Sequence, residues 1–464
     1  MSKTVILGAG LTGISAAYHL EKAGYYDYLL FEKENSPGGL CRSLFQDGFT
    51  FDFTGHLLHI NDHYFRSLIT NIIGFEMFEQ IQRRSFVYTH NRYTAYPFQG
   101  NLKGLPSNVI AECIEGFVKR KHSIHAVSTF REWVLHQFGE GFGKHFFFPY
   151  QEKIFAYNIN NLTASWTGRF VPPTTLADII DGIVNDNRNE QVGYNAQFFY
   201  PKQGGIASWV EKFASYLINP IQFNHTVTAI NLNTKQIRFS NGRTQSYDRL
   251  INTMPLDRLI DLLQDKSSTY FKKSQPNLLC NSVINFNIGF NRPDICDKHW
   301  IYFPETEIPF YRLGFPHNFS RASVPNGYSS LYGECSFLKR PTEDQQQLLH
   351  KAIEYTKKLL SFSQEDIVTQ KIVTISHAYV IYNAWRDANL QTLLSELENH
   401  AIYSVGRYGA WKYSSMQEAV LDGKDIAQII CSTTDKPHIS VVIPNKRTKT
   451  KRVRVPNTQS DRYV

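Results

Sequence analysis

The first residues whose types and spacing could do chemistry are the glycines of Gly8-Ala9-Gly10-Leu11-Thr12-Gly13. An apolar run, Thr4–Leu7, precedes them, and an apolar helical pattern over residues 14–23 follows. A second apolar run, Tyr28–Phe31, ends at Glu32. This order is typical of a βαβ unit with a GxGxxG turn and predicts dinucleotide binding. The alternative is a glycine-rich turn in an ordinary parallel sheet.

Each residue of this turn has an expected task. Gly8 permits the tight turn, Gly10 lets backbone approach a pyrophosphate, and Gly13 lets helix and strand pack closely. The helix N-terminus supplies partial positive charge to the pyrophosphate. Glu32 lies 19 residues after Gly13, where an acid accepts a hydrogen bond from a ribose hydroxyl. We therefore expect these residues, together with Thr12, to bind the cofactor.

The next segment indicates which dinucleotide binds. Lys33-Glu34-Asn35-Ser36-Pro37-Gly38-Gly39-Leu40 resembles the second glycine motif of FAD enzymes of the amine-oxidase and protoporphyrinogen-oxidase type. This resemblance favours tightly held FAD over transiently bound NAD, with Gly39 and Leu40 against the cofactor and Ser43 nearby.

Length and composition are those of a globular protein of two or three domains. The chain has 464 residues, 42% of them hydrophobic, and no apolar run reaches the ~20 residues that span a bilayer. Its six cysteines are scattered without a CxxC pair, which favours reduced thiols. The first residues enter a strand at once, so we expect no signal peptide and a cytoplasmic protein.

The positive charge is concentrated near the C-terminus. Residues 434–464 hold eight Lys or Arg and two Asp, and so carry +6 of the net charge of +8. The run at residues 446–454 could contact an anionic membrane or nucleic acid. We favour a solvated tail and expect no nucleic-acid partner, because nothing else in the chain suggests one.

The order of the segments predicts an α/β protein: a Rossmann-like FAD-binding domain with a helical insert and an antiparallel-sheet substrate domain. The FAD-binding domain is discontinuous, and Val227, in its predicted strand pair, is a further expected cofactor contact. Apolar residues at helical spacing predict helices at 108–119, 129–138, 176–184, 207–217 and 345–360. Short alternating runs predict strands at 282–288, 300–303 and 328–337. The predicted domain ranges are 1–63, 204–274 and 401–433 for FAD binding; 101–193 for the helical insert; 64–100, 194–203 and 275–400 for the substrate domain; and 434–464 for the tail.

Three histidines follow the second glycine motif. His56, His59 and His63 have i, i+3, i+7 spacing and would share a helix face that could bind a metal. Gly55 instead favours a turn, so we expect no metal. The alternatives are histidines without a ligand role, or His56 placed against the flavin.

Two arginines could bind phosphate. Arg312 follows Pro309-Phe310-Tyr311, and Arg169 follows Trp166-Thr167-Gly168. A guanidinium presents a rigid fork that matches phosphate oxygens, and two that converge would suit a diphosphate. The alternative for Arg312 is a structural pair with a carboxylate. Aromatic clusters beside Gln99 and Asn195 suit either a protein core or a nucleobase pocket.

Taken together, these segments resemble the UDP-galactopyranose mutase family, especially its eukaryotic branch. The resemblance runs from about Lys3 to Ile430, and the motifs from Tyr96 onward are more specific than the glycine motifs. The matching segments are residues 8–13, 37–40, 55–56, 96–99, 166–169, 298–305, 309–312 and 406–413.

The resemblance implies conversion of a UDP-hexopyranose into its furanose, the galactofuranose form for UDP-galactose. The family reaction needs reduced flavin without net redox change, and NADPH or NADH are candidate reductants. Flavin N5 attacks the anomeric carbon and expels UDP, the sugar ring opens and recloses, and UDP returns.

The resemblance also implies site roles. Arg169 and Arg312 would clamp the diphosphate, and His56 would lie beside the flavin ring. The implied substrate contacts are Tyr96, Gln99, Phe146, Asn195, Tyr302, Tyr382 and Tyr413, with Phe146 stacked on uracil. Arg407 would contact FAD phosphate, and a helix starting near Met416 would point at the flavin. The loop at residues 377–383 matches the family only loosely, and the role of Gln417 is open.

Two other functions stay open. One is an FAD-dependent oxidase or desaturase of the amine-oxidase type, which would not need two diphosphate arginines. The other is a non-catalytic flavin or sugar-nucleotide binding protein. The exact sugar and the oligomeric state are also open, with a homo-oligomer as one alternative.

Overall fold

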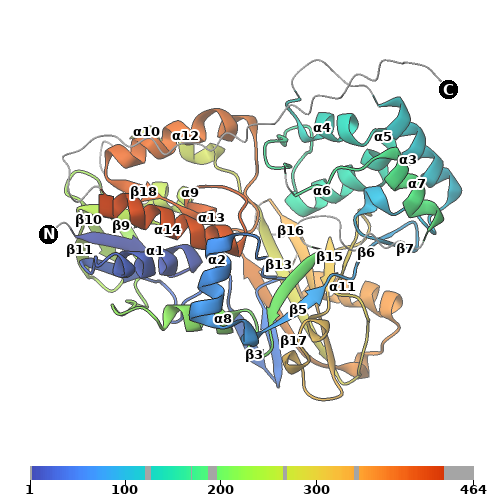
Figure 1. The fold of residues 1–464 in the computed structure, drawn as a ribbon, viewed down its shortest axis with the longest axis horizontal. Helices are drawn as coiled ribbons and strands as arrows, with labels where there is room; N and C mark the ends of the chain where they lie inside the picture. Colours follow the sequence, from blue (N-terminus) through green and yellow to red (C-terminus); the bar gives the residue numbers. More distant parts are fainter. Residues whose placement is uncertain are drawn as a thin grey trace, which may run out of the picture.

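The computed structural model describes residues 3–120, 127–168, 170–185, 196–264, 269–338 and 344–432. Figure 1 shows three groups of elements: a parallel sheet flanked by α1 and α14, a cluster of helices α3–α7, and a large sheet with α11 beside it. The predicted α/β class with a dinucleotide-binding domain, a helical insert and an antiparallel sheet is confirmed. The predicted tail lies outside the described residues.

The parallel sheet has four strands in the order β18-β12-β1-β2. It joins three distant parts of the chain, and α1 (Leu11–Lys22) and α14 (Met416–Ser432) pack against each other beside it. The central strand β12 ends at Asn252, and Pro255 is the N-cap of the helix that follows. The strands are β1 (Thr4–Leu7), β2 (Tyr28–Phe31), β12 (Arg249–Asn252) and β18 (Ile402–Ser404).

Smaller elements complete this part of the molecule. β9, β10 and β11 form an antiparallel sheet, and β3 pairs with β4. The predicted helix at residues 207–217 ends early, at Ala214, where Ser215 turns back onto Lys212. The bounds are β3 (Ser43–Gln46), β4 (Phe49–Asp52), β9 (Val227–Asn231), β10 (Gln236–Phe239), β11 (Thr244–Ser246), α8 (Ala207–Ala214), α9 (Leu256–Asp261), α10 (Thr269–Ser274) and α13 (Gly406–Gly409).

The helical insert contains the predicted helices with nearly the predicted bounds. α4 and α7 begin with capping boxes at Thr129 and Thr175. In each box the threonine side chain accepts a hydrogen bond from the backbone N–H of the third helical residue, and the side chain of that residue accepts one from the threonine N–H. The elements are α3 (Ser107–Lys119), α4 (Phe130–Gln137), α5 (Glu140–Phe142), the π-helix η4 (Gly143–Phe147), α6 (Phe148–Phe155) and α7 (Leu176–Val184).

The large sheet has seven strands in the order β17-β13-β16-β15-β14-β6-β7. Neighbours are antiparallel except β14 and β6, and β5 pairs separately with β8. The bounds are β5 (Phe78–Gln82), β6 (Ser85–Thr89), β7 (Arg92–Ala95), β8 (Gln197–Pro201), β13 (Ser282–Phe290), β14 (Trp300–Tyr302), β15 (Arg312–Gly314), β16 (Ser329–Phe337), β17 (Ile367–Ile375) and α11 (Gln345–Leu360).

Two segments pack elsewhere than the predicted domain ranges imply. α2 (His63–Leu68) and the π-helix η1 (Ile69–Ile73) after it bury Phe65 and Ile69 in the core around α1 and α14, not against the large sheet. α12 (Ala384–Asn399), which the sequence did not predict, packs on β18 of the parallel sheet. Polar and apolar residues are mixed around α12, so its helical periodicity is weak.

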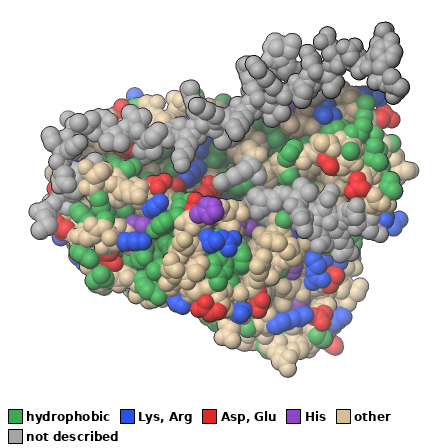
Figure 2. Space-filling model, viewed as in Figure 1, with side chains coloured by type: hydrophobic (Ala, Val, Ile, Leu, Met, Phe, Trp, Pro, Cys, Tyr) green, Lys and Arg blue, Asp and Glu red, His purple; other side chains and the backbone are tan. Residues whose placement is uncertain are grey.

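A shared buried core connects the three groups of elements. One buried cluster continues from the parallel sheet through the helical insert to the large sheet. Basic and acidic side chains are interspersed on the face shown in Figure 2. All six cysteines are free, as expected. No helix within the described ranges is both long and apolar enough to cross a membrane.

The crossing of α1 and α14 gives a first prediction. A Cβ at Gly423 would lie 2.5 Å from the Thr12 carbonyl oxygen and 2.6 Å from Ser15 Cβ. Alanine is intrinsically better than glycine in a helix by about 1 kcal/mol. We nevertheless expect Gly423→Ala to lower the free energy of unfolding by about 1–2 kcal/mol, because overpacking outweighs that gain.

Urea unfolding measures this difference. Gly100→Ala is the control, since a Cβ there would meet nothing within 4 Å. A Gly423→Ala protein more stable than the wild type would contradict the close helix crossing.

Candidate active site

Two glycines of the first turn, Gly8 and Gly13, leave no room for a side chain. Gly8 has φ +100°, and a Cβ at Gly13 would lie 1.9 Å from the Gly8 carbonyl oxygen. The turn therefore brings α1 directly against the end of β1. A GxGxxG turn at the N-terminus of such a helix is where a pyrophosphate is typically held.

The second glycine motif lies against the first. The Gly38 N–H donates to the Ala9 carbonyl at 2.8 Å, and a Cβ at Gly39 would lie 3.4 Å from Gly10 Cα. Leu40 follows, partly buried against the core. The two motifs thus form one backbone cradle.

Glu32 supplies the acid of this cradle. Its carboxylate is buried, and it accepts hydrogen bonds from Ala9 N (2.7 Å) and Glu34 N (3.0 Å). Its backbone also bonds to Gln222 and His225, which places the start of β9, with the predicted contact Val227, at the same end of the cradle. A carboxylate has about four acceptor sites, so Glu32 can still accept from ribose hydroxyls.

A third chain segment closes the cradle. Gly406 has φ +82°, and a Cβ there would lie 2.6 Å from Thr12 Oγ1. Met416 is the first residue of α14, and Ser415 and Glu418 exchange hydrogen bonds at that end. Gln417 bonds to the backbone N–H groups of Asn61 and Asp62, which assigns it a structural task.

His56 lies between the cradle and the large sheet. Its Nδ1 is buried without a hydrogen-bond partner among the described residues. Burial lowers the pKa of His56 to about 4, and the charges of Arg407 and Arg312 add to that shift. A neutral imidazole with an unpartnered polar atom fits contact with a polar edge of a bound cofactor ring.

Arg312 and Glu334 form a bidentate ion pair across β15 and β16. Arg312 Nε donates to Oε2 at 2.8 Å and Nη2 to Oε1 at 2.7 Å. Glu334 is completely buried, whereas the Arg312 side chain is 18% exposed. The Gly55 N–H points to Glu334 Oε1 at 3.4 Å, which links the pair to the turn before His56. Glu334 is therefore the carboxylate with which Arg312 forms a structural pair.

The sheet register places a row of polar residues on one face. Tyr302 lies opposite Arg312, Arg312 opposite Glu334, and Glu334 opposite Asn285. Directly opposite residues share a face of the sheet. Asn285 Oδ1 is buried without a hydrogen-bond partner among the described residues. The row crosses four strands from β14 to β13.

Tyrosines surround this row. The Tyr302 ring lies 4.9 Å from Tyr96 and 5.4 Å from Tyr150, and Tyr413 stacks on Tyr379 with ring planes at 12°. Arg407 lies 4.8 Å from the Tyr413 ring and donates to the carbonyls of Ser414 and Ala378. The structure thus gathers Tyr96, Tyr302, Tyr413, Arg312 and Arg407, which are far apart in sequence.

Other predicted site residues form contacts with neighbouring residues of the protein. Phe146 is 3% exposed between the rings of Phe98 and Tyr150, so a base could stack on it only if that aromatic stack opened. Gln99 Nε2 donates to the Pro172 carbonyl at 2.9 Å. Tyr382 Oη accepts from the Tyr413 N–H at 2.7 Å, which makes it a support for Tyr413. Arg169 and Asn195 lie outside the described residues.

The sequence did not single out four residues of this cluster. Glu334 and Asn285 lie inside apolar strand patterns, and only register reveals them. Tyr379 lies in the loosely matching loop, yet it interacts with Arg312, Glu334 and Tyr413, and burial raises its pKa to about 12. Arg83 is buried with its guanidinium 5.1 Å from the Tyr96 ring. The only feature of the sequence that marks Arg83 is a charge next to the start of a strand, β6.

The three histidines do not share a helix. His63 begins α2, while His59 Nδ1 lies 3.2 Å from the Gln197 carbonyl oxygen. Within the described ranges, no three His, Cys, Asp or Glu side chains come together as a metal site.

The sequence profile of the flavin containing amine oxidoreductases matches residues 11–431. The protein belongs to this family. Membership of this amine oxidoreductase family, together with the fold, implies FAD as the cofactor of the cradle. The buried His56 atom and the touching glycine motifs fit that group.

The proteins that are similar to this chain differ in the activities that their names give. A crystal structure of reduced UDP-galactopyranose mutase is 29% identical, with a TM-score of 0.86 over 94% of this chain and 97% of that one. Coproporphyrinogen III oxidase of Staphylococcus aureus (strain NCTC 8325 / PS 47) is 22% identical over 64% of this chain and 70% of its own length. A 4,4'-diapophytoene desaturase of S. aureus (strain COL) is 30% identical over 18% of this chain and 17% of its own length.

Lys153 fixes α6 to the sheet beside this site. It lies one turn after Tyr150, and its Nζ donates to the carbonyls of Phe303 (3.1 Å) and Glu305 (2.6 Å), just beyond Tyr302. Burial lowers the pKa of Lys153 from 10.5 to about 7, although nearby carboxylates oppose the shift.

This shift predicts a pH dependence of stability. Because the unfolded chain keeps its proton up to a higher pH, it binds more protons than the folded protein above pH 7. The free energy of unfolding attributable to Lys153 should rise by about 2 kcal/mol between pH 7 and pH 9. Urea unfolding at both pH values should show that Lys153→Met lacks this rise, while the exposed control Lys119→Met keeps it. Equal pH dependence in all three proteins would contradict the buried state of Lys153.

Proposed function

We propose that the protein is an FAD-dependent sugar-nucleotide mutase that interconverts UDP-galactopyranose, or a related UDP-hexopyranose, with its furanose. The observation that carries this proposal is the Arg312–Glu334 pair, set among tyrosine hydroxyls and linked to the His56 turn. A cationic, hydroxyl-rich site beside a flavin cradle suits a diphosphate. The 29% identity and the TM-score of 0.86 to a UDP-galactopyranose mutase support the same activity.

The donor count at Arg312 suits diphosphate binding. A guanidinium has five N–H donors, and Glu334 takes one from Nε and one from Nη2. Three donors are left, in an orientation that Glu334 fixes. Fixed donors stabilise the charge that develops on a departing diphosphate without reorganisation at the moment of reaction.

The charge balance of the cluster also suits a dianionic diphosphate. Arg83, Arg312 and Arg407 lie around the tyrosines, and Glu334 is the carboxylate paired with one of them. Tyr302 is buried and Tyr379 is partly buried, and burial raises the pKa of each, so their hydroxyls stay protonated and can donate to phosphate oxygens. Tyr413 is held for the same task by Tyr382.

When bound and reduced, flavin supplies the nucleophile for the anomeric carbon. The chain's own residues bind, orient and exclude water. His56 stays neutral at physiological pH, and its unpartnered Nδ1 would be available to a bound cofactor, while the Arg312–Glu334 pair would hold the leaving group. Arg169 and Asn195 stay predicted contacts, as do Gln99 and Phe146 on the base side.

A second function has its own support. Two curated relatives are an oxidase and a desaturase, so an FAD-dependent oxidase or desaturase is the alternative. Such an enzyme acts on a substrate by electron transfer and would not need a fixed guanidinium beside the flavin. Oxygen-dependent turnover of a neutral substrate, with a flavin spectrum indifferent to UDP, would favour it.

Turnover tests the mutase directly. We expect the dithionite-reduced, FAD-loaded protein to convert UDP-galactose partly into UDP-galactofuranose, which chromatography separates. The oxidised protein is the control and should give no furanose. Failure to form a furanose from any UDP-hexose, with flavin bound and reduced, would exclude the proposal.

Variants at residue 312 test the clamp. We expect Arg312→Lys to keep FAD but to weaken UDP binding by about 100-fold, because an ammonium cannot reproduce the fork. Arg312→Ala would leave the buried Glu334 carboxylate without its partner, which is itself destabilising. The double variant Arg312→Met/Glu334→Gln therefore accompanies Arg312→Ala, because it removes both charges of the pair. Calorimetry with UDP and flavin absorbance measure both properties. Wild-type affinity and turnover in Arg312→Lys would refute the clamp.

A further inference from the structure

The turn between α13 and α14 carries Tyr413 and is bonded along its backbone. The Lys412 N–H donates to the Arg407 carbonyl at 2.9 Å, and Arg407 Nη1 donates to the Ser414 carbonyl at 2.6 Å. Between these two bonds, the Tyr413 N–H donates to Tyr382 Oη at 2.7 Å. The backbone is therefore held on both sides of Tyr413 and at Tyr413 itself.

The residue at the start of this turn has an unusual conformation. Trp411 is completely buried and has φ +48°, in the left-handed region that a bulky side chain rarely adopts. Such a backbone conformation persists only where its surroundings hold it. The Trp411 carbonyl accepts a hydrogen bond from Arg386 Nε at 2.9 Å. A side chain of α12 is thus one of the groups that hold the turn.

Arg386 also contacts the other residue that holds Tyr413. Its guanidinium carbon lies 3.6 Å from the centre of the Tyr382 ring, whose hydroxyl accepts from the Tyr413 N–H. A cation over an aromatic face is attracted to it, and more strongly where water is excluded. The Arg386 side chain is only 11% exposed. One guanidinium therefore fixes both Trp411 and Tyr382, and these three residues form the Tyr413 support.

Arg386 is itself held in place by its neighbours. Its N–H donates to Asn383 Oδ1 at 2.8 Å, where Asn383 caps the N-terminus of α12. Arg386 Nη1 lies 3.0 Å from Asp387 Oδ1, which also accepts from Ser165 Oγ at 3.0 Å. Because Nε and Nη1 both have partners within the protein, Arg386 suits a positioning task better than contact with a substrate.

The Tyr413 ring is confined as well as its backbone. The Phe170 ring lies 4.5 Å away edge-on, and Tyr379 stacks on Tyr413. Among the described residues, none forms a hydrogen bond with the Tyr413 hydroxyl. The backbone and the ring are thus fixed, while the hydroxyl is left for a ligand.

We propose that Arg386 is a positioning residue for Tyr413, because it holds the Tyr382 ring and the Trp411 carbonyl so that the Tyr413 hydroxyl meets the diphosphate. Arg386 does not touch the diphosphate itself. This inference rests on the proposed sugar-nucleotide mutase function, and it gives a task at the site to α12, which packs on β18 of the parallel sheet.

A double-mutant cycle on UDP affinity tests this inference in the FAD-loaded protein. We expect Tyr413→Phe and Arg386→Met each to weaken UDP binding by about 10-fold in calorimetry, as for loss of one hydrogen bond to a charged group. Because Arg386 acts through the Tyr413 hydroxyl, the double variant should also bind about 10-fold more weakly, whereas independent effects would multiply to about 100-fold.

A milder variant covers the case in which Arg386→Met does not load FAD. Arg386→Lys keeps a cation for the Tyr382 ring but lacks the fork that also reaches the Trp411 carbonyl, so we expect a loss of about 3-fold. Combined with Tyr413→Phe, it should leave the loss at about 10-fold, against about 30-fold for independent effects.

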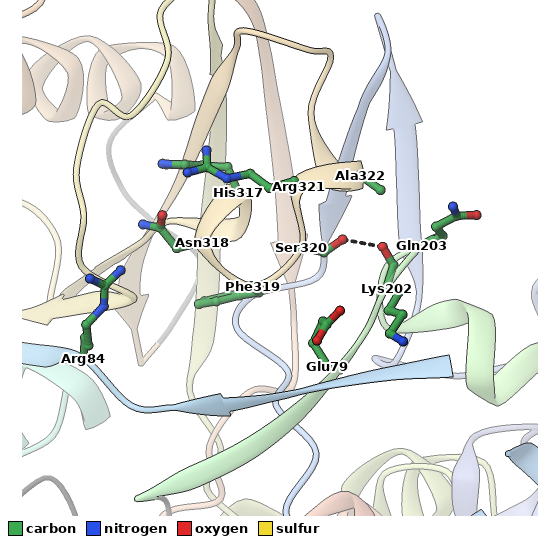
Figure 3. Close-up of a pocket in the computed structure, with 10 residues that line it drawn as sticks. All are labelled: Glu79, Arg84, Lys202, Gln203, His317, Asn318, Phe319, Ser320, Arg321 and Ala322. Atoms are coloured by element: carbon green, nitrogen blue, oxygen red, sulfur yellow. Dashed lines mark hydrogen bonds between the residues drawn. The ribbon is translucent and has the colours of Figure 1, made fainter. Parts of the chain in front are cut away.

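Two controls separate positioning from a general loosening of the site. Arg386→Met combined with Tyr302→Phe should show the product of the two single losses, because β14 and not the turn carries Tyr302. Arg321→Met should leave UDP affinity unchanged. Arg321 lines the polar hollow shown in Figure 3, pairs with Asp294 at 2.7 Å, and shares that hollow with no residue of the Tyr413 support. Flavin absorbance shows that each variant keeps FAD.

The possible results distinguish this inference from the proposed function. Losses that multiply in the cycle of Arg386 with Tyr413, or wild-type UDP affinity in Arg386→Met, would overturn the positioning task and leave the mutase proposal standing. A wild-type protein that binds no UDP would overturn the proposed function, and the inference with it.

Discussion

The buried carboxylate of Glu334 is the constraint on which the site depends. A buried ionised carboxylate is costly unless it is paired and hydrogen-bonded, and removal of one partner of such a pair commonly costs 3–5 kcal/mol. Arg312 supplies the pair from the neighbouring strand, and the Gly55 N–H approaches the same carboxylate. The register of β14, β15 and β16 must then be kept, since it alone brings Tyr302, Arg312 and Glu334 into one row.

This constraint ties the large sheet to the cofactor cradle. Gly55 precedes His56, and the charges of both Arg312 and Arg407 act on the His56 ring. The cradle in turn needs contact between Gly38 and Ala9, and between Gly406 and Thr12. Residues from the beginning, middle and end of the chain therefore meet within one continuous core. A flavin in the cradle and an anion at Arg312 would face each other across His56.

Much of this arrangement could be predicted from the sequence. The local geometry of a βαβ unit requires glycines at fixed spacing and an acid such as Glu32, so the sequence alone predicts the cradle. Helices with a clear apolar stripe, such as α7, were predicted with correct bounds, whereas α12, with mixed faces, was missed. Resemblance identified Arg312, Tyr302, Tyr96 and Tyr413, and the structure gathers them. Glu334, Asn285 and Tyr379 could not be found, because strand register and loop conformation depend on tertiary contacts.

The same limit explains what the aromatic segments do. Phe146 is of a residue type that can stack on a base, and the structure places its ring between those of Phe98 and Tyr150. Tyr382, a predicted substrate contact, accepts a hydrogen bond from the Tyr413 N–H. Composition therefore indicates where aromatic residues cluster, while packing decides what each ring contacts.

A crystal structure of the reduced, FAD-loaded protein with UDP tests the central claim most directly. We predict that Arg312 keeps both bonds to Glu334 while its remaining donors lie about 3 Å from diphosphate oxygens, with the Tyr302, Tyr379 and Tyr413 hydroxyls around them. A diphosphate bound away from Arg312, or an Arg312 that leaves Glu334 to reach it, would contradict a guanidinium fixed in advance for the leaving group.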